Sequence, residues 1–79
     1  MGKQARPRPR YLAAKLLAIR QRLGVSQSEM VRLLNARLSS ARVSEYESGI
    51  REPNLLTIQA YSRVAGIPVE KIIDDELTI

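Results

Sequence analysis

The sequence contains no cysteine and no histidine. Without cysteine the chain forms no disulfide and no thiolate metal site, and without histidine it lacks the usual partner of a catalytic serine. No apolar stretch approaches the roughly 18 residues of a membrane span, and no signal-peptide core is present. We therefore expect a cytoplasmic protein with no metal, no cofactor and no membrane partner.

The chain carries a net positive charge that is unevenly distributed along the sequence. Its 79 residues suffice for one small domain and carry a net charge of +5. Residues 1–63 hold twelve basic and four acidic side chains, whereas residues 64–79 hold one basic and four acidic. A basic body suits a polyanion such as nucleic acid or an anionic membrane, and a surface charged for solubility gives the same composition.

The first ten residues, MGKQARPRPR, are basic and proline-containing. Their two prolines exclude a helix, and no apolar residue larger than Ala5 follows Met1. We predict a disordered basic arm over residues 1–10, which is either a solvated tail or a segment that touches phosphates or a minor groove.

Apolar residues recur at helical spacing from residue 11 onward and predict an all-α domain over residues 11–74, followed by a C-terminal tail over 75–79. Ser26 and Glu29 have the spacing of a capping box, and Ser39 and Asn54 are candidate N-caps. The predicted helices cover 11–23, 27–35, 40–48, 55–65 and 69–74.

The helical spacing also indicates which residues form the core. The apolar residues expected to face inward are Leu12, Leu16, Ile19, Leu23, Met30, Leu33, Leu34, Leu38, Val43, Tyr46, Leu55, Ile58, Tyr61, Ala65, Val69, Ile72 and Ile73. Leu77 and Ile79 either pack or remain free. The acidic residues 74–76 read as a solvated tail, and because no nucleophile or general acid–base pair accompanies them, we do not expect an enzyme.

The predicted helix over 40–48 has only two large apolar residues, so most of its surface must face solvent or a ligand. A helix with short outward side chains approaches a surface closely, which suits a major groove about 12 Å wide. Gln27 opens the preceding helix, where it can donate to a phosphate oxygen. Two short helices joined by a tight turn predict a helix-turn-helix. The outward residues of the second are Ser40, Ala41, Arg42, Ser44 and Glu45.

Four short motifs occur in a fixed order between residues 12 and 74. They are R-x-x-x-G-x-S-Q-x-E-x at 20–30, V-S-x-Y-E-x-G at 43–49, R-x-P at 51–53 and G-I-P-V-E-K-I-I at 66–73. This order and spacing resemble the Cro and phage-repressor type of helix-turn-helix domain, also called the xenobiotic-response-element family. The resemblance implies a five-helix, lambda-repressor-like fold and a sequence-specific regulator, expected to be a repressor, that binds double-stranded DNA as a homodimer.

The resemblance also implies roles for individual residues. Base reading falls to Ser40, Ala41, Arg42, Ser44 and Glu45, and phosphate binding to Gln27 and to the loop that holds Ile50 and Arg51. Arg20 and Glu47 match a structural ion pair of the family. We expect Ser39 and Arg37 to add phosphate contacts. Both precede the predicted helix over 40–48, which we call the reading helix.

Two assignments stay open at this point. Arg42 either bonds a guanine or contacts a phosphate or Glu45, and Glu45 either accepts from a cytosine or pairs with Arg42, of which we favour pairing. Nine residues lead from Leu34 to Val43, where the family usually has seven. The two extra residues either lengthen the second helix or widen the turn.

A second hypothesis makes the protein an interaction module or an antitoxin whose main partner is another protein. Helix-turn-helix folds serve in both settings, and the short side chains of the reading helix favour neither. For the regulator, we expect the contact between two copies to use the fifth helix and residues 76–79.

Overall fold

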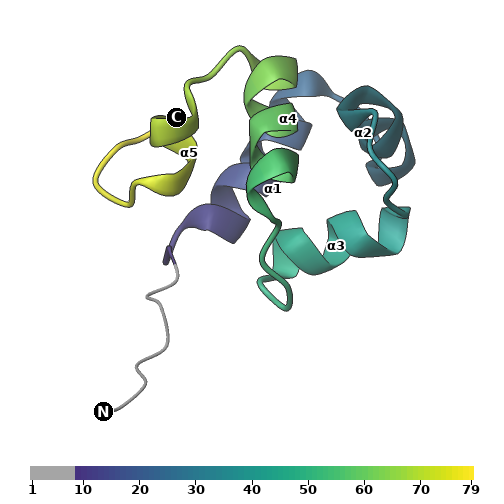
Figure 1. Cartoon of the computed structure of the whole chain (residues 1–79), viewed down its shortest axis with the longest axis horizontal. Helices are drawn as coiled ribbons and strands as arrows, with labels where there is room; N and C mark the ends of the chain where they lie inside the picture. The colour runs from purple at the N-terminus through teal and green to yellow at the C-terminus, as the bar shows by residue number, and fades with distance from the viewer. Residues whose placement is uncertain (1–8) are drawn as a thin grey trace.

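The computed structural model describes residues 9–79, so the predicted arm lies outside the described residues except for Pro9 and Arg10. Within this range the chain forms five helices and no strand, which confirms the all-α prediction (Figure 1). No helix in this part of the chain has the length and apolar content needed to cross a bilayer. The helices are α1 (Leu12–Leu23), α2 (Gln27–Leu34), α3 (Ser40–Ser48), α4 (Leu55–Ala65) and α5 (Val69–Ile73).

Short-range side-chain bonds set the beginnings of α2, α3 and α4. The Ser26 hydroxyl accepts the Glu29 backbone N–H at 3.0 Å, and the Glu29 carboxylate accepts the Ser26 N–H at 3.0 Å, which completes the predicted capping box. Ser39 and Asn54 cap α3 and α4 by accepting N–H groups three residues ahead. These bonds satisfy amides that the helix itself leaves without partners, which fixes where each helix begins.

The hydrophobic core lies where α1 packs against α3, α4 and α5, and α2 closes it by packing against α3 and α4. Tyr61, Leu16 and Ile72 have no exposed surface. The buried apolar residues are Leu12, Leu16, Ile19, Met30, Leu34, Val43, Tyr46, Ile58, Tyr61 and Ile72. This set determines which side of α3 faces inward and which side is left for a ligand.

Four residues predicted to be in the core are exposed instead. Leu23 is 38%, Leu33 46% and Leu55 70% exposed, and Ile73 is 38% exposed. Helical spacing gives the angle of a side chain about its own helix and does not say whether another element covers that angle. For Leu55 and Ile73 the reason is visible, because both line an open groove bordered by α1, α4 and α5.

The turn between α2 and α3 contains the two extra residues. The second helix ends at Leu34, and Asn35 follows in the left-handed conformation with φ of 52°, which asparagine tolerates better than most residues. The extra length therefore widens the turn and does not extend the helix. Leu38 in this turn is partly buried and packs against the core, as predicted.

The C-terminal residues are attached to α1, which the sequence did not indicate. The Asp75 carboxylate accepts the backbone N–H groups of Arg10 at 2.8 Å and Tyr11 at 3.1 Å. Lys15, only 7% exposed, donates to the Lys71 and Asp74 carbonyls at 2.8 and 2.7 Å and so caps the end of α5. The expectation of a solvated tail at residues 74–76 is therefore wrong for Asp75, which ties the residues just before α1 to the far end of the sequence.

Candidate nucleic-acid interface

α3 is anchored to the domain by a narrow apolar stripe. Val43 has no exposed surface and Tyr46 has 4%, and both face the core that α1 and α2 complete. The opposite side of the helix is open, and α3 lies along the edge of the domain in Figure 1. The exposed or partly exposed residues on this open side are those predicted to read bases: Ser40, Ala41, Arg42, Ser44 and Glu45.

An acidic residue joins two arginines on this open side. The Nε atoms of Arg42 and Arg51 lie 3.2 and 3.1 Å from the same oxygen, Glu45 Oε1. The three side chains are 42%, 51% and 36% exposed, in the order Arg42, Arg51 and Glu45. We name these three residues the outer cluster. The pairing of Arg42 with Glu45 was the favoured interpretation, whereas the bond from Arg51 was not anticipated, because the loop geometry that brings it to Glu45 has no local signal.

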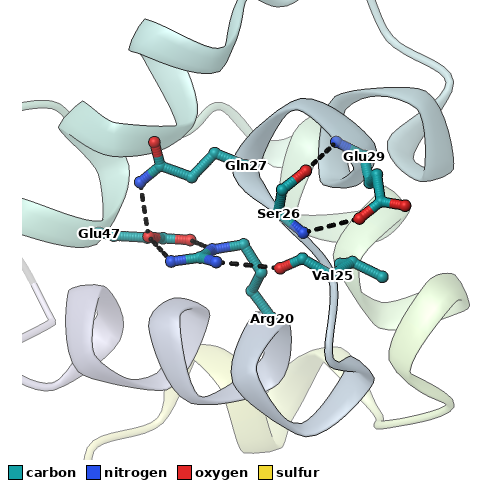
Figure 2. Close-up of polar contacts among 6 residues, drawn as sticks. All are labelled: Arg20, Val25, Ser26, Gln27, Glu29 and Glu47. Atoms are coloured by element: carbon teal, nitrogen blue, oxygen red, sulfur yellow. Dashed lines mark hydrogen bonds and ion pairs between the residues drawn. The ribbon is translucent and has the colours of Figure 1, made fainter.

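A second arginine–glutamate contact lies on the inner side of α3 (Figure 2). Arg20 donates to Glu47 through Nε at 2.7 Å and Nη2 at 3.0 Å, and to the Val25 carbonyl at 3.0 Å. Gln27 donates to the same carboxylate at 3.1 Å. Glu47 is 6% exposed and Arg20 is 18% exposed. We name Arg20, Gln27 and Glu47 the inner cluster; it joins α1, α2 and α3.

The inner cluster keeps Arg20 charged and sets the position of α2 against α3. The hydrogen bond to Glu47 raises the pKa of Arg20 above its ordinary value. Tyr61 lies near this charge pair, and burial raises the pKa of its phenol. Among the described residues the Tyr61 hydroxyl finds no hydrogen-bond partner. Arg20 and Glu47 thus form the ion pair that the family resemblance implied.

The residues predicted to bind phosphate occupy different surroundings. Gln27 begins α2 and gives one amide N–H to Glu47, while its amide carries a second donor. Arg51 is exposed and belongs to the outer cluster through its bond to Glu45. The Ser39 hydroxyl accepts the Arg42 N–H as a helix cap. Arg37 is exposed and lines a cavity with Arg63 of α4, so the structure does not join it to Arg51 or Gln27.

The comparisons with known proteins agree with this geometry. Residues 16–72 match a family model described as helix-turn-helix. The chain belongs to the helix-turn-helix family of the Cro and C1 type. This membership confirms the resemblance read from the motifs and supports a DNA-binding transcription regulator. No curated protein sequence matches this helix-turn-helix chain.

A solved structure is also similar to this helix-turn-helix domain. It is the crystal structure of the P22 c2 repressor protein in complex with synthetic operator 9T in the presence of Tl+. The similarity has a TM-score of 0.72 at 19% sequence identity and covers 81% of this chain and 94% of that chain. At this identity the similarity establishes the fold, which is that of a phage-repressor DNA-binding domain.

Proposed function

We propose that the protein is a sequence-specific regulator, acting as a repressor, that inserts α3 into the major groove of double-stranded DNA. The observation that carries the proposal is the one-sided anchoring of α3 by Val43 and Tyr46, which leaves its short residues open. The P22 c2 repressor was crystallised with a synthetic operator, and this supports double-stranded DNA as the ligand. Repression follows from occupancy, because the bound protein blocks polymerase or a competing activator.

Phosphate contacts on either side of α3 supply most of the affinity in this proposal. Gln27 lies at the start of α2, where the helix dipole is positive, and its amide has a second N–H besides the one given to Glu47, which can donate to a phosphate oxygen. Arg51 follows α3 and remains half-exposed after bonding Glu45. Because binding to phosphates releases counterions, affinity falls steeply as salt rises.

The basic N-terminal segment belongs to the same interface. Pro9 and Arg10 line one cavity with Gly49 and Arg51, so the described part of the chain begins beside the loop that follows α3. Residues 1–8 lie outside the described part of the chain, and we assign them phosphate contacts from their charge and their point of attachment. The side chains that supply the charge are Lys3, Arg6 and Arg8.

We further propose that the protein binds its operator as a homodimer, with half-sites about one helical turn apart. The sequence favoured α5 and residues 76–79 as the contact; Ile79 packs against the core, whereas Ile73 of α5 and Leu77 of the tail are each 38% exposed. The open groove that Leu55 and Ile73 line supports a contact that extends from α5 to the beginning of α4, because Leu55 keeps 70% of its surface exposed. Covering this apolar surface with a second copy removes it from water.

The proposal is tested by titrating the protein into random duplex DNA at two salt concentrations and by selecting bound sites from a random pool. We expect binding with a steep salt dependence and a selected sequence with two-fold symmetry. Sedimentation equilibrium with Leu55→Ser as a matched variant tests the dimer, which the substitution should weaken while leaving the fold intact.

The exposed apolar residues of α4 also favour a second candidate function, a protein-interaction module or antitoxin. Leu55 and Leu56 are 70% and 73% exposed, a surface that a different protein can cover as well as a second copy. Absence of DNA binding at low salt in the same titration would replace the regulator with this candidate.

A further inference from the structure

The outer cluster contains an acidic group on the surface that faces the proposed DNA. A carboxylate there repels phosphates, yet α3 carries Glu45 in its middle, with 36% of the side chain exposed. Its Oε1 atom is shared by Arg42 from one turn earlier and Arg51 from the following loop. The side chain therefore does more than neutralise one arginine, because it links the helix that would read bases to the loop that would bind phosphate.

The geometry leaves both arginines able to act while Glu45 holds them. Each approaches the carboxylate through Nε, and a guanidinium carries four further N–H donors on its two Nη atoms. A guanine accepts a guanidinium through O6 and N7, and the paired cytosine offers an N4 amino donor. One G·C pair thus presents acceptors for Arg42 and a donor for Glu45 in the same groove.

We propose that Glu45 is a specificity-determining residue that makes Arg42 and itself read a G·C pair as a unit. This inference rests on the proposed function. Where the groove supplies a cytosine amino group, the carboxylate gains a donor and Arg42 stays aligned on the guanine. Where the groove presents another base pair, the carboxylate is repelled by the phosphates and gains no hydrogen-bond donor, so the affinity for that site is lower.

The outer cluster also limits binding to DNA of arbitrary sequence. Non-specific binding depends on the number of phosphates that basic side chains neutralise. Because Glu45 occupies Arg42 and Arg51 together, the three side chains present one net positive charge instead of two. Glu45 therefore lowers the affinity for random DNA more than the affinity for a site that satisfies it, and the ratio of the two affinities rises.

The experiment compares the wild-type protein with Glu45→Gln on two duplexes, a site selected by the wild-type protein and a random sequence. We expect affinity for the random duplex to rise about three- to tenfold and the salt slope to steepen by about 0.9, the effect of one more phosphate contact. We expect affinity for the selected site to rise less or to fall. A repeat selection with Glu45→Gln should lose one G·C position, because glutamine prefers adenine.

Two controls separate this inference from a simple charge effect and from a folding role. Glu70→Gln makes the same charge change on α5, away from α3 (Figure 1), and should leave the affinity ratio unchanged. Circular dichroism and urea unfolding should show a folded Glu45→Gln variant. An equal rise on both duplexes with an unchanged selected sequence would overturn the role of Glu45 while leaving the regulator in place. Failure of the wild-type protein to bind duplex DNA would overturn both.

Discussion

α3 carries an arginine–glutamate contact on each of its two sides, and the two differ in surroundings. In the inner cluster, Glu47 is 6% exposed and accepts two N–H groups of Arg20 and one of Gln27. In the outer cluster, Glu45 is 36% exposed and meets two arginines through single Nε contacts. The same pair of residue types therefore serves two purposes within three positions of one helix.

The difference shows how burial assigns a role to a charge. A buried charge must keep all its partners, since removing one leaves an ion without solvent or counter-charge. An exposed ion pair is screened by water and contributes little to folding, so its members can exchange one partner for another. The inner cluster is therefore suited to hold α1, α2 and α3 together, and the outer cluster is suited to meet a ligand.

The largest effect that would test this contrast is on folding. Glu47→Gln removes the charge that holds Arg20, and we expect a loss of about 3–5 kcal/mol in the free energy of unfolding. Glu45→Gln is the matched control on the outer side, with an expected change within about 0.5 kcal/mol. Urea unfolding followed by circular dichroism measures both. Equal losses in the two variants would erase the distinction between the clusters.

The next effect concerns the two arginines of the outer cluster. Arg42→Ala should lower the preference for a selected site over random DNA by about 1–3 kcal/mol, the value of one bidentate base contact. Arg51→Ala should lower the affinity for the selected and the random duplex by the same factor and reduce the salt slope by about 0.9. Gln27→Ala, which removes a second predicted phosphate donor, should also weaken binding to both duplexes equally. Competition binding measures these ratios, and uniform weakening by Arg42→Ala would show that Arg42 contacts phosphate.

Two carboxylates outside the clusters, Asp75 and Glu29, accept backbone N–H groups and make the stability of the fold depend on acid. Bonds from Arg10 and Tyr11 hold the pKa of Asp75 below its ordinary value of 3.8, and bonds from Ser26 lower the pKa of Glu29 below 4.5. Both groups titrate at lower pH in the folded than in the unfolded state, so their stabilisation is full above about pH 4.5 and is lost as the pH falls through the folded pKa. Thermal melts from pH 7 to 2.5 measure this, and Asp75→Asn should flatten the acid limb.

The smallest expected effect lies beside the inner cluster. Tyr61→Phe removes a buried hydroxyl that has no hydrogen-bond partner among the described residues, so the free energy of unfolding should stay within about 0.5 kcal/mol or rise. Differential scanning calorimetry of the wild-type protein and the variant detects the change in melting temperature. A loss above about 1 kcal/mol would mean that the hydroxyl belongs to the inner cluster through a bridging water.

Features that depend on neighbouring residues were predictable from the sequence. α3 and α4 begin and end where predicted, because Ser39 and Asn54 supply caps and glycines follow both helices. The family motifs gave the fold, and they also indicated Arg20 and Glu47, which lie 27 residues apart. Local bonding rules and a recognised pattern therefore accounted for most of the architecture.

Features that depend on how elements meet were not predictable. Lys15 reads as an ordinary surface lysine, yet it is buried because the end of α5 presents two carbonyls to it. Leu55 has a core-like position in its helix but borders a groove that no element among residues 9–79 fills. The sharing of Glu45 between Arg42 and Arg51 depends on the path of the loop after α3. Residue spacing within a single helix does not predict these contacts, because each depends on how two separate elements are placed.

The bonds from Asp75 to Arg10 and Tyr11 have a consequence for how the protein is made. The first helix emerges from the ribosome before Asp75, which is 65 positions after Arg10. Until Asp75 and the carbonyls that Lys15 binds have left the exit tunnel, the N–H groups of Arg10 and Tyr11 and the Lys15 ammonium lack these partners. Docking of residues 71–75 onto the start of α1 therefore follows synthesis of the rest of the domain, and a chain stalled at residue 70 should remain sensitive to protease.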